Sequence, residues 1–361
     1  MESWLVGHTL KAIAMASRQT DGQSGRLLTS LCFVIGTVWG SGSFPWLACH
    51  GWLDNSGSFD TLAPLFPKDH RVICFDLPGN GISSHYPKGI TYNHADLFLT
   101  FRRVAAHFGL KRYGILGHSM GGGVALPYTT LHPKEVVALI MLDVLRLRYR
   151  TPKDVKELTR RALDEFLATE DKLMSGRKPP TLSREEAKEK VLSSKLPTYL
   201  APLASLTSLT SFTALNYFHG PDSMTPENCE ILLERGMTRL PRRQKLEHER
   251  DHHMFTRDIR QNNLSYYGFE RETLLNFVRN VKCPMLAIRT DRTPLHECDG
   301  EFVDTRYVLV RTYDRVQIAK STIVCLTPEL LLLFSGLSES MSWPQTRIFV
   351  LRRCPVPTMF T

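Results

Sequence analysis

The chain has 361 residues, of which 42% are hydrophobic and 22% are charged. These ordinary globular values exclude a wholly disordered, collagen-like or coiled-coil chain, and the length allows two domains or one domain with an inserted subdomain. The net charge of +9 would suit a nucleic-acid or acidic-membrane partner only if the basic residues were clustered.

An apolar run spans residues 27–39. It is shorter than the roughly 20 apolar residues that cross a bilayer, so we predict no membrane span. The small residues that follow it leave a signal peptide as one interpretation. We favour a β-strand, because the second half of the run is rich in strand-forming side chains: Val34, Ile35, Thr37, Val38 and Trp39.

Residues 44–144 alternate short apolar strands with helical segments. The expected strands are 46–49, 71–76, 113–116 and 136–142, and the expected helices are 58–65, 93–108 and 120–131. Such alternation calls for right-handed crossovers. It predicts an α/β fold with a mostly parallel sheet and helices on both faces.

Residues 145–258 are different, with long, charged, helix-prone segments such as 154–172 and 183–196. The basic residues gather here, but acidic residues are interleaved with them at i,i+4 spacing. We therefore interpret them as solvated helix faces and predict no nucleic-acid partner. The strand pattern resumes at 279–288, and 306–311, 322–326 and 347–351 are also apolar enough for strands.

Neither the cysteines nor the histidines indicate a metal site. The eight cysteines include no Cys-x-x-Cys pair and no zinc-like spacing to histidine, which predicts reduced thiols in an intracellular protein. His248, Asp251, His252 and His253 have metal-like spacing. Because they lie in a charged segment, we interpret them as a solvated helix face.

The sharpest chemical motif is a G-x-S-x-G between a strand and a helix: Gly117-His118-Ser119-Met120-Gly121. In a nucleophile elbow, the serine occupies a strained strand-to-helix turn and the glycines permit close backbone approach. The dipole of the following helix and the N–H of Met120 can stabilise an oxyanion. Ser119 is therefore the predicted nucleophile.

A second motif ends an earlier strand, His50-Gly51-Trp52. The glycine would let the backbone bring the Trp52 N–H into the same site as a second oxyanion donor, with His50 and Gly51 lining the pocket. Alone, this motif could equally be a tight turn. The loop of residues 76–84 is expected to shape the rim.

Together these motifs resemble the α/β-hydrolases, and specifically the serine hydrolase-like, kraken-type proteins. The resemblance is strong over residues 45–145 and weaker to about Ile288. It rests on His50-Gly51-Trp52-Leu53-Asp54-Asn55, Phe75-Asp76-Leu77-Pro78-Gly79-Asn80-Gly81-Ile82-Ser83-Ser84-His85-Tyr86, Ile115-Leu116-Gly117-His118-Ser119-Met120-Gly121-Gly122 and, in the weaker part, Phe255-Thr256-Arg257-Asp258-Ile259-Arg260.

The resemblance implies a hydrolase of small ester or acyl substrates, without a cofactor and with a helical cap over the pocket. It also implies a cytoplasmic or peroxisome-associated location. Residues 1–43 would then be an atypical extension, 44–144 the first part of the core, 145–258 the cap, and 259–361 the second part with an atypical tail. The sequence predicts no oligomeric state.

The serine also favours one chemistry within the fold. Related dehalogenases and epoxide hydrolases place an aspartate at the elbow, whereas Ser119 would form an acyl-enzyme with the help of a base. In this fold an acid and then a histidine follow the serine along the chain. Asp143 and Asp291 both follow strands and could orient an imidazole, but either could be only a helix cap or a turn residue, and neither need be the acid.

The catalytic base is missing from its expected place. After His296 the chain has no histidine, and His296 lies in the loop of the acid strand. His118 is expected to point away from Ser119 and to line the floor of the site. The tail beyond about Asp291 and the first 43 residues do not match the family, which opens with two antiparallel strands. A catalytically impaired protein that binds a ligand or a protein partner is therefore the alternative to an active hydrolase.

Overall fold

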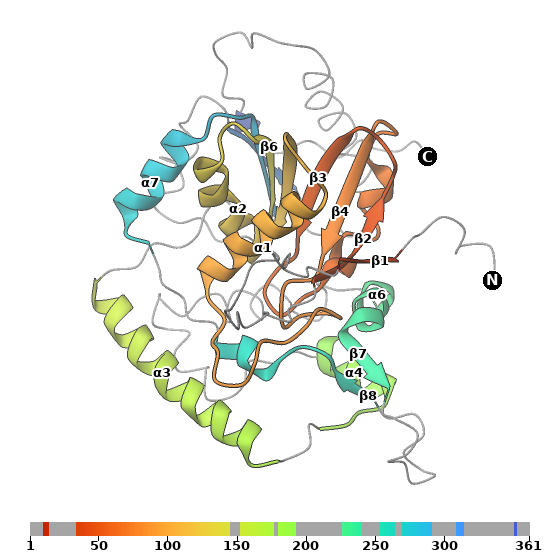
Figure 1. Ribbon diagram of the computed structural model, residues 1–361, viewed down its shortest axis with the longest axis vertical. Coiled ribbons are helices and arrows are strands. Elements are labelled where there is room, and N and C mark those ends of the chain that lie inside the picture. Colours follow the sequence, from red (N-terminus) through yellow and green to blue (C-terminus); the bar gives the residue numbers. More distant parts are fainter. Residues whose placement is uncertain are drawn as a thin grey trace, which may run out of the picture.

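The computed structural model describes residues 10–13, 34–144, 152–176, 180–192, 226–239, 253–263, 269–290, 308–313 and 350–351. Its centre is a nine-stranded sheet in the order β1-β2-β4-β3-β5-β6-β9-β10-β11 (Figure 1). The strands are β1 (Leu10–Ile13), β2 (Val34–Trp39), β3 (Phe44–Cys49), β4 (His70–Phe75), β5 (Tyr113–His118), β6 (Val136–Leu142), β9 (Met285–Thr290), β10 (Val308–Tyr313) and β11 (Val350–Leu351).

The sheet is parallel from β4 to β11 and antiparallel at its first edge. β2 pairs antiparallel with both β1 and β4. The prediction of a strand in the second half of the apolar run is thereby confirmed. Our expectation that the first 43 residues lack an opening pair of antiparallel strands is wrong, because β1 and β2 form one.

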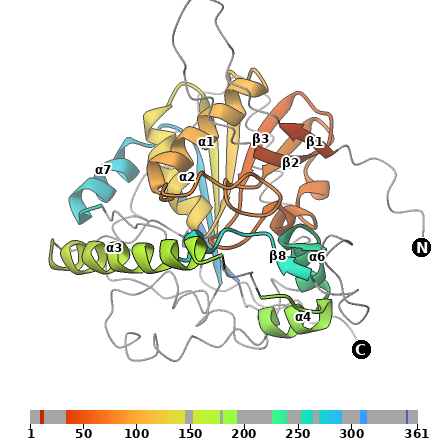
Figure 2. The same cartoon turned by 60° about the horizontal axis from the view of Figure 1, so that its bottom comes forward.

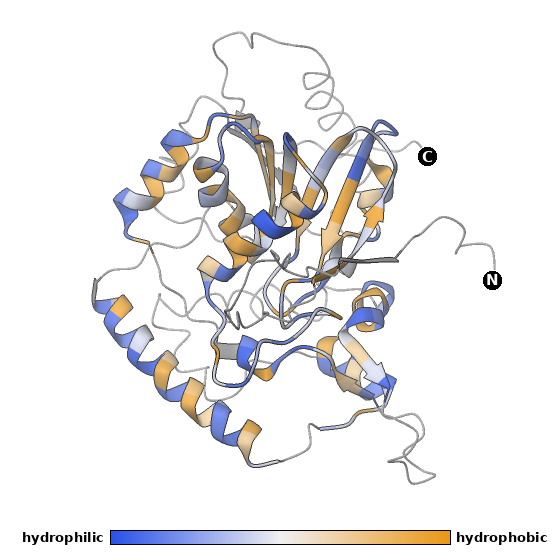
Figure 3. Ribbon diagram, viewed as in Figure 1, coloured by the Kyte–Doolittle hydropathy of each residue, from blue (hydrophilic) through white to orange (hydrophobic). Residues whose placement is uncertain are grey.

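Alternating side chains of the central strands enter two separate cores, as the two-residue period of a strand requires. On one face the strands pack against α1 (His94–His107), α2 (Met120–Leu131) and α7 (Arg271–Asn280). On the other face, Trp46 packs among apolar residues of η1 (Ser56–Phe59) and η2 (Ala63–Leu65). Figure 3 shows the apolar colouring of the central strands. The prediction of a mostly parallel sheet flanked by helices is confirmed.

Between β6 and α7 the chain forms a separate group of elements, which we call the insert. Its described elements are α3 (Pro152–Met174), α4 (Arg184–Leu192), α6 (Pro226–Gly236), β7 (Met237–Arg239), β8 (His253–Phe255) and η6 (Ile259–Asn263). In Figures 1 and 2 they lie below the sheet. α6 contacts η1, which follows β3, so the insert meets the carboxyl edge of the sheet.

The basic residues of α3 have the acidic partners expected from their spacing. Arg160 pairs with Asp164 at 3.2 Å, and Arg161 pairs with Glu165 at 2.7 Å. The helix expected around His253 is wrong, because His253 begins β8, which pairs antiparallel with β7. His248, Asp251 and His252 lie outside the described residues. No group of three metal-ligating side chains gathers within the described ranges.

Several predicted boundaries need correction. Residues 58–65 form parts of two 3₁₀ helices instead of one helix, and the run 279–288 begins in the last turn of α7 before β9. The predicted strands 306–311 and 347–351 overlap β10 and β11, which continue the parallel sheet beyond β9. The run 322–326 and the end of the predicted helix 183–196 lie outside the described residues.

The described cysteines Cys49, Cys74, Cys229 and Cys283 are buried free thiols. Burial raises the pKa of Cys283 to about 12, so this thiol stays protonated. Of the helices in the described ranges, none is both long and apolar enough to cross a membrane.

Candidate active site

Ser119 lies at a sharp turn between β5 and α2. Its backbone has φ 48° and ψ −114°, a sparsely populated conformation for a residue with a side chain. Two hydrogen bonds hold the turn: the Ser119 N–H donates to the Leu142 carbonyl at 2.9 Å, and its own carbonyl accepts from the Gly123 N–H at 2.9 Å. Such strain costs about 1–3 kcal/mol and is retained where surrounding structure enforces it.

The end of β3 packs directly on this turn. A Cβ atom on Gly121 would lie 2.2 Å from the Cys49 carbonyl oxygen, so the first turn of α2 can approach β3 only without a side chain there. A Cβ atom on Gly51 would lie 2.9 Å from His118 Nδ1 and 3.5 Å from Ser119 Cβ. The structure thus brings the two predicted motifs together.

The His50 imidazole holds the peptide bond between Gly51 and Trp52. The Leu77 N–H donates to His50 Nε2 at 3.0 Å, so the proton of a neutral ring is on Nδ1. Nδ1 lies 2.7 Å from the Gly51 carbonyl oxygen and donates to it. Because a trans peptide directs its N–H opposite to its C=O, this bond also sets the direction of the Trp52 N–H.

The Met120 N–H belongs to the first turn of α2, where no intrahelical acceptor exists. It follows Ser119 directly. The Gly51–Trp52 peptide comes from the other element that packs on this turn.

The Nδ1 edge of the His118 ring faces an acid. Its Nδ1 lies 3.8 Å from Asp54 Oδ2 and makes no hydrogen bond with any described residue. Asp54 also accepts hydrogen bonds from the Asn55 N–H at 3.0 Å and from the Ser58 hydroxyl. Sequence reasoning assigned no role to Asp54, although it lies within the quoted motif.

Of the two candidate acids, the structure describes Asp143. It follows β6, has φ 57°, and its N–H donates to the Ile288 carbonyl at 2.6 Å. His118 at the end of β5 pairs with Leu142 at the end of β6. The residues that follow them, Ser119 and Asp143, therefore stand at corresponding positions on neighbouring strands. Asp291 comes directly after β9 but lies outside the described residues, as does His296. Among the described residues, no side chain hydrogen bonds to the Ser119 hydroxyl.

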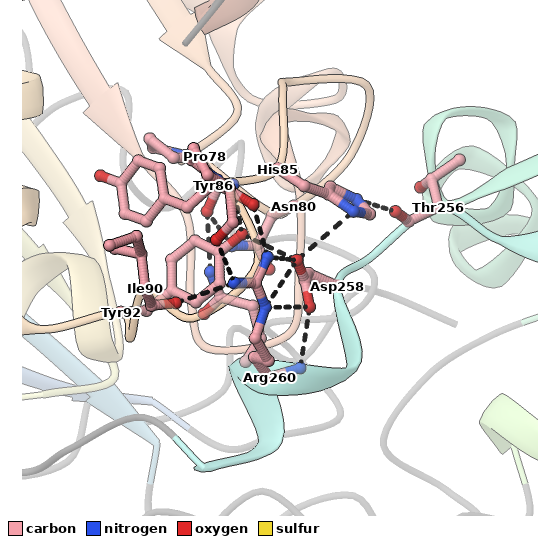
Figure 4. Close-up of polar contacts among 11 residues, drawn as sticks. Pro78, Asn80, His85, Tyr86, Ile90, Tyr92, Thr256, Asp258 and Arg260 are labelled. Atoms are coloured by element: carbon pink, nitrogen blue, oxygen red, sulfur yellow. Dashed lines mark hydrogen bonds and ion pairs between the residues drawn. The ribbon is translucent and has the colours of Figure 1, made fainter. Parts of the chain in front are cut away.

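A second polar cluster joins the insert to the loop after β4 (Figure 4). Its centre is the ion pair of Asp258 with Arg260, 2.6 Å apart and both 4% exposed. Burial alone would raise the pKa of the Asp258 carboxyl, but the hydrogen bonds and charge of Arg260 outweigh burial and hold that pKa below its ordinary value. Both residues belong to the quoted motif 255–260, to which sequence reasoning gave no role.

The fold and the elbow place this protein among the α/β hydrolases. A family model described as the alpha/beta hydrolase fold matches residues 46–218. A probable serine hydrolase of Drosophila melanogaster is 32% identical over 293 residues, which cover 76% of this chain and 78% of the relative. A serine hydrolase-like protein of Danio rerio is 38% identical over 157 residues, covering 43% of this chain and about half (48%) of the relative.

A solved thioesterase domain from the curacin biosynthetic pathway has the same fold. It is 16% identical, the alignment covers 90% of this chain and 99% of that domain, and the TM-score is 0.63. The chain belongs to the α/β-hydrolase family, among the serine hydrolase-like proteins. The resemblance expected from the sequence is confirmed.

Proposed function

We propose that this protein is a serine hydrolase of small ester or acyl substrates, with Ser119 as its nucleophile. The observation that carries the proposal is the strained backbone of Ser119 between β5 and α2, against the end of β3. Such a conformation costs free energy, and a nucleophile held at a strand-to-helix turn above a sheet edge requires it.

The proposed reaction passes through an acyl-enzyme. Ser119 Oγ attacks the acyl carbon, and the N–H groups of Trp52 and Met120 stabilise the oxyanion that forms. Removal of one such donor costs about 10² to 10³ in kcat in enzymes where this was measured. Collapse of the intermediate expels the alcohol, and water then releases the acid.

The proton of the Ser119 hydroxyl needs a base, which an acid orients. Asp143 and Asp291 are the candidates for the acid, since both follow strands that neighbour one another in the sheet. His118 is not proposed as the base, because it precedes Ser119 directly in the elbow, whereas the base of this fold follows the acid along the chain. His296 remains the candidate that the chain offers after the acid strand.

We further propose that the insert acts as a cap over the pocket. Its support is the contact of α6 with η1, close behind the Gly51–Trp52 peptide. A cap at this position would select small substrates and exclude water from the oxyanion. We also propose the cytoplasmic or peroxisome-associated location that the family resemblance implies.

A fluorophosphonate probe tests the nucleophile. We expect the purified protein to be labelled at Ser119 and the Ser119→Ala variant to remain unlabelled, with circular dichroism showing that the variant is folded. Absence of labelling in folded wild-type protein would contradict the proposal.

The second candidate is a pseudo-hydrolase that keeps the pocket and binds a ligand or protein without turnover. It is favoured by the absence of histidine from Glu297 to the last residue. Without a base, the remaining oxyanion hole and binding supply roughly 10³ to 10⁴ over the rate in water. Ester turnover that disappears in Ser119→Ala would exclude this candidate.

A further inference from the structure

The buried pair of Asp258 and Arg260 is fully satisfied by hydrogen bonds. Arg260 Nη2 donates to Asp258 Oδ2 at 2.6 Å, and Arg260 Nε lies 3.1 and 3.2 Å from the two carboxylate oxygens. The Arg260 backbone N–H also donates to Asp258 Oδ1 at 2.9 Å. A buried ion pair is tolerated when its remaining donors and acceptors are paired, so this cluster is suited to fix a geometry.

The pair binds the loop that follows β4. Arg260 donates to three carbonyl oxygens of that loop, those of Tyr86 at 2.6 Å, Pro87 at 2.7 Å and Ile90 at 2.8 Å. The Asp258 N–H donates to the Gly79 carbonyl at 2.8 Å. The Tyr92 hydroxyl donates to Asp258 Oδ2 and accepts from the Tyr86 N–H, both at 3.0 Å. Figure 4 shows how the loop surrounds the guanidinium.

The next residue carries this anchoring to the candidate active site. The Gln261 N–H donates to the Asp258 carbonyl at 3.0 Å, and its side-chain amide donates to the Pro78 carbonyl at 2.7 Å. The Gln261 carbonyl oxygen in turn accepts from the Trp52 indole N–H at 2.8 Å. Trp52 is only 2% exposed, so its ring has one well-defined environment.

We propose that Asp258 and Arg260 are positioning residues that fix the oxyanion-hole peptide between Gly51 and Trp52 from the side of the insert. His50 holds the carbonyl of this peptide from the core, and Gln261 holds the indole of its second residue. Hydrogen bonds therefore hold both the carbonyl of this peptide and the side chain of its second residue. This inference rests on the proposed function, since it assigns a partner to the proposed Trp52 donor.

The variant Arg260→Lys tests the inference, because a lysine keeps the charge but cannot bind three carbonyls and a carboxylate in one fork. Tyr92→Phe is the milder second variant, which removes one hydroxyl from the cluster. Arg235→Lys is the matched control. Arg235 joins the insert to the core through Asp60 at 2.6 Å and Thr37 at 2.8 Å, and neither partner belongs to the Asp258–Arg260 cluster.

The first readout is the indole N–H resonance of Trp52, assigned among the five tryptophans by its absence in Trp52→Phe. We expect it to shift in Arg260→Lys and in Tyr92→Phe and to stay in place in Arg235→Lys. An unmoved resonance in both cluster variants, or an equal shift in the control, would overturn the inference. This readout does not depend on activity.

The second readout is turnover of a small chromogenic ester such as p-nitrophenyl acetate. A misplacement of about 1 Å can cost about 10²-fold, so we expect kcat of Arg260→Lys to fall by about that factor while KM changes less than about twofold. Equal losses of kcat in Arg260→Lys and Arg235→Lys would contradict a positioning role. If wild-type protein neither turns over ester nor reacts with a fluorophosphonate, the proposed function fails, and the resonance still decides whether the pair holds Trp52.

Discussion

Within the described residues, three side-chain-bearing residues have a positive φ: Leu53, Ser119 and Asp143. Each follows a strand at the carboxyl edge of the sheet, behind β3, β5 and β6. Conformations of this kind are retained only where the surrounding packing over-determines them. Their concentration at one edge supports the view that this edge is the working part of the molecule.

Gly51 is the residue at which an added methyl group has the clearest consequence. In Gly51→Ala, the new Cβ would lie 2.9 Å from His118 Nδ1, so the imidazole or the peptide must shift. We expect kcat to fall by about 10- to 100-fold and the free energy of unfolding by about 1–3 kcal/mol.

Gly236→Ala is the matched control, because its Cβ would lie at an ordinary contact distance of 3.5 Å from Asn55 Nδ2. Steady-state kinetics and urea unfolding of both variants check the prediction. Unchanged kcat in Gly51→Ala would contradict the close packing of Gly51 on the elbow.

Asp258 gives a prediction for pH. Its folded pKa lies below the ordinary 3.8, so the carboxylate stabilises the fold above about pH 3.8 and this contribution is lost as pH falls through the folded pKa. Arg260, His85 and Tyr92 are the groups that face it. Asp258→Asn should cost about 3–5 kcal/mol near pH 7, since it leaves Arg260 buried and unpaired.

The difference between wild type and Asp258→Asn should shrink as pH falls below 3.8. Urea unfolding of both proteins from pH 7 to pH 3 measures it. A difference that stays constant across this range would show that the carboxylate is not stabilised in the folded state.

At the scale of elements, His70 at the start of β4 gives a second prediction for the pH dependence of stability. The Trp46 indole N–H donates to His70 Nδ1 at 2.9 Å across β3 and β4. Burial lowers the pKa of His70 below 6.5, and the charge of Asp69 offsets this only in part. The folded protein therefore resists the proton that the unfolded chain binds, and stability should fall as pH drops below 6.5.

His70→Asn isolates this effect, because an asparagine oxygen can replace Nδ1 as the acceptor and does not titrate. We expect the variant to lose less stability than wild type between pH 6.5 and pH 5, measured by thermal or urea unfolding. Equal pH dependence in the two proteins would assign the loss to other groups.

The elements also show which sequence patterns were informative. Strands β3 to β6 are short apolar runs bounded by turn residues, so their period and length predict them. α7 was not expected, because the sequence pattern left residues 271–278 without a predicted element, although the buried residues Leu274, Leu275 and Val278 have helical spacing. β8 was missed because a charged run with histidines resembles a helix surface, and only pairing with β7 makes it a strand.

At the scale of the whole molecule, the sequence predicted the sheet, the strand-to-helix turn at Ser119 and the turn at His50-Gly51-Trp52 after β3, because each depends on contiguous residues. It could not predict the Asp258–Arg260 cluster, whose partners lie more than 160 residues away in the loop after β4. Nor could it predict that His118 faces Asp54. Contacts of this kind depend on how the insert and the loops meet, which no local pattern encodes.

The proposed reaction requires that Ser119 form an acyl-enzyme. Brief exposure of the protein to excess p-nitrophenyl acetate, followed by acid quenching and mass spectrometry of the intact chain and its peptides, tests it directly. We predict one acetyl group per chain, on the peptide that contains Ser119, and none in Ser119→Ala. Ester turnover of equal rate in Ser119→Ala, or wild-type protein without any acetylation of Ser119, would contradict the claim.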